Sequence, residues 1–272
     1  MIEYSPQDQE ANLVHAGCFG LLSLSSPTLV SVSGNITLQN LLNLTTIFLP
    51  ALETVGLPFH IDGLPNLTNL TIPKLSYVGD FHLAYTPALS SMDLDGLTNL
   101  SSVYINGVGL TSMPLIDVST KVASFVVGGV PNMPLISVWT PYIGLLQVNG
   151  NGFTTMVTYN LLTTAGIKAI DTFSISGCGI LSDVDSNTAT TNENFIASGN
   201  SFQDLDLSSW HINGSAYIQA NPQLQNIEWN SDTNVMDTIV IRDNALLNSV
   251  GNFWVTNVST LVLVGSFGTG FL

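Results

Sequence analysis

The stretch PALETVGLPFHIDGLPNLTNLTI, residues 50–72, is followed directly by PKLSYVGDFHLAYTPALSSMDL, residues 73–94, and the two segments are copies of one unit. Each copy opens with Pro-x-Leu-x-x-Val-Gly, continues with an apolar-x-apolar triplet and closes with Pro-x-Leu-x-x-apolar-x-apolar. Self-similarity at a period of about 22 residues is typical of a solenoid, in which each coil extends a shared core. The repeat therefore predicts the fold before any single motif does.

The apolar-x-apolar triplet marks the coils along the rest of the chain. Short alternation of apolar and polar residues predicts a strand, and the Gly, Asn, Asp or Pro that usually follows predicts a turn. We expect an all-β, right-handed parallel β-helix with one strand per coil and the apolar members inside. Five of them should form an internal Phe ladder: Phe59, Phe81, Phe125, Phe173 and Phe195. The triplets begin at Ile36, Phe59, Phe81, Val103, Phe125, Leu146, Phe173, Phe195, Ala216, Ile239 and Leu261.

The N-terminal residues carry signals of a short capping helix over residues 5–17. Ser5 is a candidate N-cap, Pro6 suits the first helical position, Asp8 completes a capping-box pattern and Gly17 is a stop signal. Such a helix would cover the apolar end of the first coil. The sequence thus predicts an N-terminal segment over residues 1–26 with a capping helix, and a β-solenoid repeat domain over residues 27–272.

The two cysteines fall far apart in the expected solenoid. Cys18 follows the predicted helix, and Cys178 comes about seven coils later, which at roughly 4.8 Å per coil places it over 30 Å away. A disulfide requires Cα atoms within about 7 Å of each other. We therefore expect that Cys18 and Cys178 do not pair with each other.

Composition excludes some partner classes. The 272 residues are 45% hydrophobic and only 8% charged, with four Lys and Arg against nineteen Asp and Glu, giving a net charge of -15. Nucleic acid and anionic membrane surfaces would be repelled by this charge. The opening MIEYSPQDQE lacks the basic and apolar regions of a signal peptide, and no apolar run approaches the ~18 residues of a membrane span.

Sequons for N-glycosylation recur along the chain. An Asn- and Thr-rich sequence also produces Asn-x-Ser/Thr by chance, but these sequons fall in expected turns or at outward strand positions, which favours glycosylation of a secreted protein. Such a protein needs a leader, so we expect the sequence to be part of a longer gene product. The candidate glycosylation sites are Asn35, Asn43, Asn66, Asn69, Asn99, Asn213 and Asn257.

The Leu-rich unit, the Ala-Gly-Cys18 segment before the first coil and the stretch GNSFQDLDLSSW at residues 199–210 together resemble fungal GPI-anchored cell-wall organisation proteins. The repeats of that family are similar to the receptor L domain, a right-handed parallel β-helix with leucine-rich character. The resemblance implies a glycoprotein of the cell surface or cell wall, with wall polysaccharide or wall proteins as candidate partners. Membrane attachment would then depend on a GPI signal that this sequence does not contain.

Candidate catalytic groups are few. The pairs Asp93/Asp95 and Asp204/Asp206 occupy alternating positions, so each pair should share the outward face of a strand. Paired carboxylates perform acid and base chemistry in hydrolases. They also keep an apolar solenoid soluble, and we favour that interpretation because the basic residues are scattered over different coils. We therefore predict no catalytic residues and a protein that is not an enzyme.

Metal and ligand sites are also weakly indicated. The segment 183–194 matches the first ligand positions of an EF-hand loop but lacks its Gly and its final Glu, and the four His do not suggest a ligand set. We expect no metal and no cofactor. His60, His82 and Tyr104 occupy the middle position of successive triplets, so they should form an outward column. That column is a candidate surface-binding platform or pH-sensitive patch, although it also fits a half-exposed sheet face.

Three function classes remain open. The first is a non-enzymatic protein that contributes to fungal cell-wall organisation, which follows from the resemblance. The second is a ligand- or glycan-binding ectodomain like receptor L domains, which would show an exposed aromatic patch on one sheet. The third is a β-helix carbohydrate-active enzyme, which requires carboxylates that converge in a cleft.

Overall fold

The computed structural model of the chain describes residues 2–3, 12–112, 116–118, 121–131, 138–140, 142–150, 169–178, 189–208, 210–229, 237–251 and 258–265. The chain divides into two compact units. The first comprises Met1–Met133 and Ser137–Thr140, and the second comprises Pro134–Ile136 and Pro141–Leu272. No helix occurs among the described residues, so none of them belongs to a helix that could cross a membrane.

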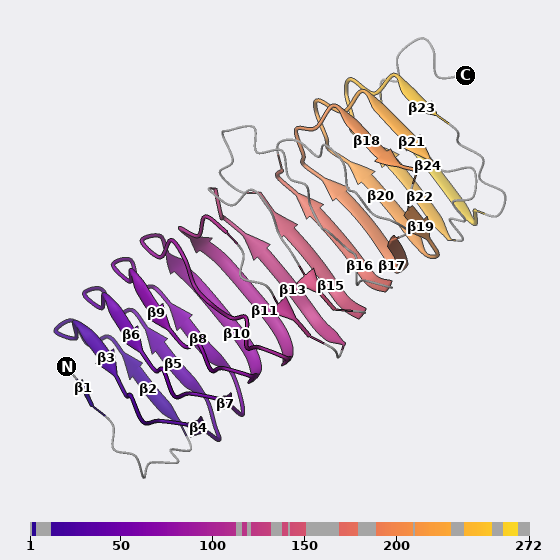
Figure 1. Cartoon of the computed structure of the whole chain (residues 1–272). Helices are drawn as coiled ribbons and strands as arrows, with labels where there is room; N and C mark the ends of the chain where they lie inside the picture. Colours follow the sequence, from indigo (N-terminus) through magenta and orange to yellow (C-terminus); the bar gives the residue numbers. More distant parts are fainter. Residues whose placement is uncertain are drawn as a thin grey trace. The chain divides into compact units, whose positions relative to one another are not determined.

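The main sheet of the first unit follows the predicted triplets. Its strands lie in sequence order and pair in parallel (Figure 1). Short strands β4 (Ser31–Val32) and β7 (Thr54–Val55) pair with each other, and β7 also pairs with β10. The strands of the main sheet are β2 (Leu13–Ala16), β5 (Ile36–Gln39), β8 (Phe59–Asp62), β10 (Tyr77–Thr86), β11 (Asn99–Val108) and β13 (Val122–Gly128).

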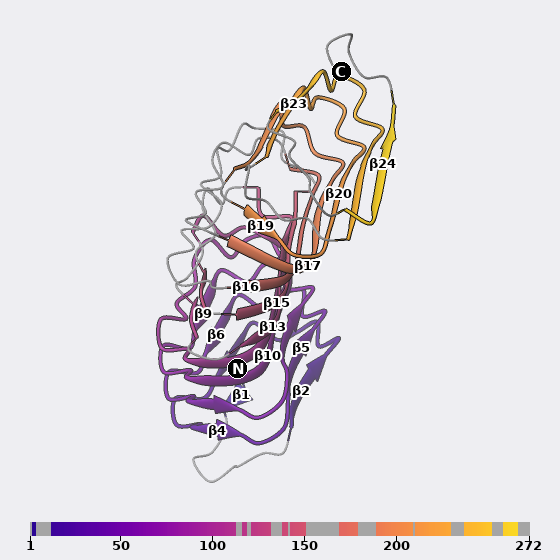
Figure 2. The same cartoon turned by 90° about the vertical axis from the view of Figure 1, so that its right-hand side faces the viewer.

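A second sheet of the first unit uses a different part of each coil. Its parallel order is β1 (Ile2–Glu3), β3 (Ser23–Ser25), β6 (Thr46–Phe48) and β9 (Asn69–Thr71). Figure 2 shows β6 and β9 on the opposite side of the coils from β2 and β5. A further parallel pair joins β12 (Ile116–Asp117) to β14 (Val138–Trp139). Each coil therefore contributes to separate sheets, as a solenoid requires.

The second unit repeats this arrangement. Its main sheet pairs successive strands in parallel, and β19 (Trp210–Ile212) adds to β17. A smaller parallel sheet contains β18 (Asp204–Leu207), β21 (Asn226–Trp229) and β23 (Ser249–Gly251). The main strands are β15 (Tyr142–Asn149), β16 (Ala169–Ser176), β17 (Ala189–Ser198), β20 (Ser215–Gln219), β22 (Thr238–Arg242) and β24 (Thr260–Val264). The predicted all-β parallel solenoid with coils of about 22 residues is thereby confirmed.

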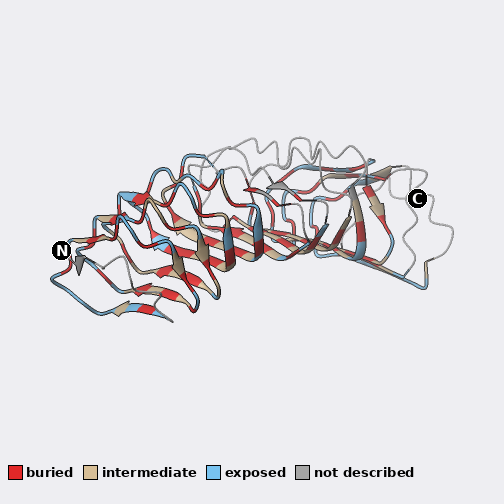
Figure 3. Cartoon of the chain, turned by 60° about the horizontal axis from the view of Figure 1, so that its bottom comes forward, coloured by how far each residue is buried: buried red, intermediate tan, exposed pale blue. Residues whose placement is uncertain are grey.

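The interior of each unit is built from the apolar members of the triplets. Along the strands, buried positions alternate with partly exposed ones, as Figure 3 shows. The predicted Phe ladder is confirmed as core, since Phe59, Phe81, Phe125, Phe173 and Phe195 are all at most 1% exposed. Phe59 and Phe81 meet edge to face at 5.9 Å between ring centroids, while Phe173 and Phe195 stack at 5.5 Å.

One triplet departs from the inward orientation. Leu261 in β24 is 49% exposed and Leu263 is 37% exposed, although they are in register with the buried Ile239 and Ile241. The strand order ends at β24, so these side chains have a paired strand on one side. The alternation therefore predicted the strand correctly, but it wrongly predicted that the side chains of Leu261 and Leu263 are buried.

The predicted N-terminal helix is wrong over the residues that the structure describes. Leu13–Ala16 form β2, and residues 4–11 lie outside the described part. Leu13 is buried and in register with Ile36, so β2 supplies one more coil before the first predicted triplet. At residues 13–16, parallel pairing and burial of Leu13 outweigh the helix prediction. Strand pairing thus begins before residue 27, where the sequence placed the start of the solenoid.

The turn signals mark the points where the main strands end. Gly63 directly follows β8 and has φ +69°. Gly107 is the second-last residue of β11 and has φ +63°. Both values lie in the left-handed region that favours glycine. A Cβ at Gly63 would lie 2.8 Å from Oδ1 of Asn40, which itself has φ +54° in the preceding coil. The tight turn after β8 fixes the position of Asp62, the last residue of that strand.

Candidate functional site

The predicted outward column on the first unit is confirmed as a ring stack. Parallel register aligns His60 of β8 with His82 of β10, and His82 with Tyr104 of β11. The two imidazole rings lie 4.0 Å apart at 8°, and His82 and Tyr104 lie 4.5 Å apart at 12°. All three side chains are half-buried on the outside of the sheet. The β-ladder therefore positions the rings by backbone register, without help from a loop.

Polar partners surround the edge of this stack. Gln39 of β5 places its Nε2 3.0 Å from Nε2 of His60, and the same imidazole nitrogen lies 3.7 Å from Oδ2 of Asp62. At the other end, Nδ2 of Asn106 donates to the hydroxyl of Tyr104 at 3.0 Å. Gln39, Asp62 and Asn106 share one register row, two residues further along their strands on the same face. The edges of His60 and Tyr104 thus have polar partners, whereas the ring faces are stacked on one another.

The stacking changes what the column offers to a ligand. A platform for sugar rings exposes aromatic faces, but here each face of His82 is covered by a neighbouring ring. By register, the outer faces of His60 and Tyr104 are directed towards Thr37 and Val126. The column therefore presents nitrogen- and oxygen-bearing edges, which suit hydrogen bonding or metal coordination better than stacking on a carbohydrate.

The structure also brings together a cluster that the sequence reasoning missed. His60, Asp62 and His82 each offer one ligand atom, and these atoms all lie within 4.8 Å of one another. The expectation that the histidines form no ligand set considered histidines alone. The signal was nevertheless present, because Asp62 stands two residues after His60 and so shares its face of β8.

Electrostatics within the column act most clearly on His82. Burial lowers the pKa of His82, the neighbouring His60 lowers that pKa further, and Asp62 opposes both effects. Two further titratable groups lie on this face: Tyr104 on β11, and Asp80 on β10, whose Oδ1 accepts a hydrogen bond from Ser102. Folding therefore favours the neutral form of His82.

We expect the first unit to lose stability on mild acidification. Because the pKa of His82 is lower in the folded chain than in the unfolded chain, its contribution is fully present above the ordinary pKa of about 6.5. As the pH falls through that value towards the folded pKa, the unfolded chain takes up the proton first, and the free energy of unfolding decreases. Denaturant midpoints measured from pH 7.5 to 5 in a chelating buffer test this.

His82→Phe is the control for that experiment, since it retains a ring in the stack and removes the titrating nitrogens. The variant should show a shallower decline in midpoint over the same pH range. Acidic residues titrate in both proteins, so only the difference between the two curves counts. An identical decline in both would contradict the assignment to His82.

The predicted carboxylate pairs are both exposed, and they differ in structure. Asp204 and Asp206 share the outward face of β18, as expected. Asp93 and Asp95 lie outside any strand, so their placement on a strand face was wrong. In each pair one carboxylate braces a local turn: Oδ1 of Asp93 accepts from the amide of Asp95, and Oδ1 of Asp206 accepts from the amide of Ser208.

A shallow depression lies beside β9 and reaches one of the two pairs. It is lined by residues 68–73 and by Ser91, Met92 and Asp93. Asp93 is its one carboxylate, and no basic residue is among those that line it. General acid and base chemistry on a glycoside needs two carboxyl groups held on either side of the bond. This depression does not supply them.

The candidate glycosylation sites are accessible where the structure describes them. Asn43, Asn66, Asn69, Asn99 and Asn213 are exposed, and Asn35 is half-buried, with its Nδ2 donating to Oγ1 of Thr37 at 2.9 Å. Asn257 lies outside the described residues. Asn66 occupies a turn and donates from Nδ2 to the carbonyl of Leu42 in the preceding coil at 2.7 Å. The positions agree with the turns and outward sites expected from the sequence.

The two cysteines have different surroundings. Cys18 in the first unit is exposed, whereas Cys178 in the second is buried, and neither forms a disulfide. Burial raises the pKa of the Cys178 thiol to about 12, although a backbone hydrogen bond from Gly150 opposes the shift. A thiol with so high a pKa carries almost no thiolate at neutral pH and is unreactive. Cys178 therefore belongs to the core of its unit.

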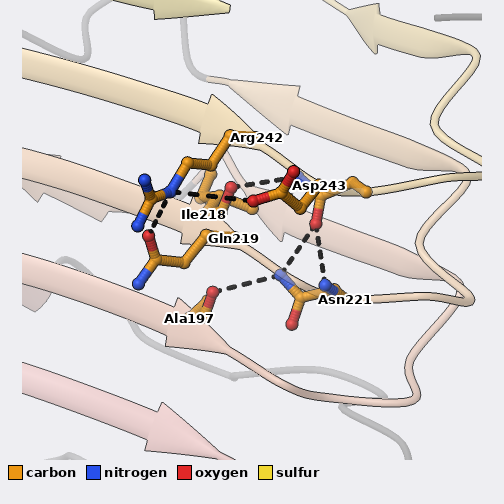
Figure 4. Close-up of polar contacts among 7 residues, drawn as sticks. Ala197, Ile218, Gln219, Asn221, Arg242 and Asp243 are labelled. Carbon is orange, nitrogen blue, oxygen red and sulfur yellow. Dashed lines mark hydrogen bonds and ion pairs between the residues drawn. The ribbon is translucent and has the colours of Figure 1, made fainter. Parts of the chain in front are cut away.

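A buried asparagine ladder in the second unit was not anticipated. Asn200, Asn221 and Asn244 are each at most 3% exposed and follow the main strands of successive coils. Oδ1 of Asn221 accepts from the amide of Asn200 at 2.9 Å. Nδ2 of Asn221 donates to the carbonyl of Ala197 at 3.1 Å (Figure 4). Nearby on the surface, Nε of Arg242 donates to Oε1 of Gln219 at 2.9 Å. The recurrence of Asn at about 22-residue spacing was the available signal.

Comparison with protein-family models, with curated proteins and with solved structures finds no match. The fold and its surface therefore carry the functional argument.

The first part of the EF-hand-like segment, residues 183–188, lies outside the described residues, while Asn194 belongs to β17.

Proposed function

We propose that this chain is a non-enzymatic surface glycoprotein that contributes to the organisation of the fungal cell wall. The observation that carries the proposal is the exposure of sequon asparagines on the coils of both units: Asn43, Asn66, Asn69, Asn99 and Asn213. A repeat array holds each acceptor at a fixed place on its coil, so attached glycans would extend from defined points of each unit. The proposal also draws on the family resemblance of the repeats.

The distribution of carboxylates supports a role without catalysis. Catalysis requires groups that are held together where water is excluded. Asp93 and Asp95 are exposed on the first unit, Asp204 and Asp206 are exposed on the second, and each pair is engaged in local hydrogen bonds. A structural wall component needs a stable, glycosylated surface and no catalytic groups. Exposed carboxylates with local hydrogen bonds fit that role.

A ligand-binding ectodomain is the second candidate, and the ring stack bears on it. Receptor-like recognition of glycans would draw on exposed aromatic faces, whereas His60, His82 and Tyr104 cover one another. A glycan-binding surface is therefore less well supported than a structural glycoprotein. Binding through the polar edges of the column remains compatible with the structure.

The test is a genetic rescue with the full-length gene. We expect that changing Asp93, Asp95, Asp204 and Asp206 together to Asn leaves the gene able to rescue a wall-defective deletion strain, because these carboxylates serve solubility and turn structure. Rescue is scored as growth on a wall-perturbing dye. Removal of glycans from the secreted protein should increase its electrophoretic mobility in both versions, which verifies secretion and glycosylation.

Two results would overturn the proposal. The first is loss of rescue by a quadruple variant that is secreted and folded normally. The second is measurable turnover of a wall glucan by the purified wild-type protein. Either one would favour a carbohydrate-active enzyme.

A further inference from the structure

The cluster of His60, Asp62 and His82 on the first unit is not needed for the proposed function. We propose that His60, Asp62 and His82 bind one divalent transition-metal ion of the zinc class. Each supplies one ligand atom, and the three atoms lie within 4.8 Å of one another. The inference rests on the first unit alone and does not depend on the role of the protein in a cell wall.

Backbone register holds the three ligands on one face. His60 and Asp62 stand two residues apart on β8, so both side chains leave the same side of the sheet, and His82 is directly opposite His60 on β10. Both strands are central members of the main sheet of their unit. Ligand atoms placed by paired strands need only side-chain rotation to converge, which lowers the ordering cost of binding.

The distances require a modest contraction. Zinc binds imidazole nitrogen and carboxylate oxygen at about 2.0–2.2 Å, so two ligand atoms on one ion lie roughly 3.0–3.5 Å apart. Nε2 of His60 is already 3.7 Å from Oδ2 of Asp62. All three side chains are half-buried and outside the packed interior, so they turn without disturbing the core.

The ring stack is the feature that must give way. Two parallel imidazoles at 4.0 Å have in-plane lone pairs that run side by side and do not converge. At least one ring must therefore rotate out of the stack, and the amide of Gln39 must release Nε2 of His60. Metal binding and stacking of His60 on His82 thus exclude each other, which links the ion to the conformation of this face.

The donor set selects the class of ion. Two imidazoles and one carboxylate suit Zn²⁺, Co²⁺, Ni²⁺ or Cu²⁺, whereas Mg²⁺ and Ca²⁺ require more oxygen ligands. Three protein ligands leave a further coordination position for water or an external group. Histidines outside the cluster, such as His211 in the second unit, serve as internal references for weak, unspecific binding.

The experiment is a calorimetric titration of the purified, chelator-treated chain with ZnCl₂. We expect saturable binding of one equivalent, and no saturable binding of MgCl₂. Visible absorption of added Co²⁺ provides a second readout, because bands of low-coordinate cobalt require protein ligands. His60→Ala and His82→Phe should each weaken zinc binding more than about tenfold, since each removes a direct ligand, and Asp62→Asn should do so because it replaces the carboxylate with a neutral amide.

Matched controls separate loss of a ligand from loss of structure. His82→Phe retains a ring beside Tyr104, and Tyr104→Phe alters the same stack without removing a ligand atom. Tyr104→Phe and His211→Ala should bind zinc as the wild type does, and far-UV circular dichroism should match for all variants. The proposal is overturned if the wild type shows no saturable zinc binding, or if His60→Ala and His82→Phe bind with wild-type affinity.

Discussion

Phe125→Ala is expected to lower the free energy of unfolding by about 3–5 kcal/mol, because it empties a fully enclosed site in the Phe ladder. Phe125 lies in the middle of β13, is 0% exposed and is in register with Val103 of β11. The β-ladder fixes the spacing of the coils, so the surroundings relax little into the space. Denaturant unfolding, followed by circular dichroism, measures the loss.

His82→Ala is the matched control for this prediction, since it also deletes a ring from the same sheet of the first unit. His82 points outward and is half-buried, so its removal should cost far less than removal of Phe125. Equal destabilisation by the two substitutions would mean that the outer stack contributes as much as the core. A midpoint unchanged by Phe125→Ala would contradict the enclosed packing of the ladder.

The repeat made the interior predictable from the sequence. In a solenoid each coil buries the same positions, so Phe59, Phe81, Val103 and Phe125 recur at steps of 22 residues, each followed two positions later by a second apolar residue. Period and alternation are properties of the sequence itself. They suffice to assign strand, face and neighbour without knowledge of any other contact, and the register between β8 and β10 agrees with them.

Residues 13–16 show where a prediction from local signals is wrong. Ser5, Pro6 and Asp8 satisfy the rules of a helix start, but the tetrapeptide Leu13–Ala16 pairs with β5. The carbonyl of Asn35 accepts from the amide of Leu13 at 2.8 Å, a contact 22 positions away in the chain. Hydrogen bonding to the next coil and burial of Leu13 decide the outcome, and neither is visible in a local window.

The candidate site was predictable only in part for a similar reason. The middle position of each triplet placed His60, His82 and Tyr104 in one column, which the structure confirms. The inclusion of Asp62 follows from adding the next outward position of β8 to the column. The face-to-face orientation of the rings depends on side-chain rotamers and packing, and the residue pattern does not encode these.

The asparagine ladder leads to the second large effect. Asn221→Ala should lower the free energy of unfolding by about 2–6 kcal/mol, because it leaves buried backbone groups without partners. The amide of Asn200 loses its acceptor at 2.9 Å, and the carbonyl of Ala197 loses its donor at 3.1 Å. Nδ2 of Asn221 also ceases to donate to Oδ1 of Asn244. Denaturant unfolding measures the cost.

Amide hydrogen exchange locates that cost within the second unit. The amide of Asn200 should exchange faster in Asn221→Ala than in the wild type, since its acceptor is gone, while the amide of Asn221 still donates to Oδ1 of Asn244 at 3.0 Å. Asn213→Ala is the control, because Asn213 is exposed and outside the ladder. That substitution should change stability by less than about 0.5 kcal/mol.

Asn221→Leu distinguishes hydrogen bonding from the filling of space. Coils of the first unit carry buried Leu41 and Leu64 at the corresponding position, directly after the left-handed residues Asn40 and Gly63, so an aliphatic side chain suits this place in the fold. In the second unit, however, the backbone groups of Asn200 and Ala197 depend on an amide side chain at residue 221. We therefore expect Asn221→Leu to remain destabilised although it fills the volume. Full recovery of stability by Leu would show that the ladder acts through packing and that its hydrogen bonds contribute little.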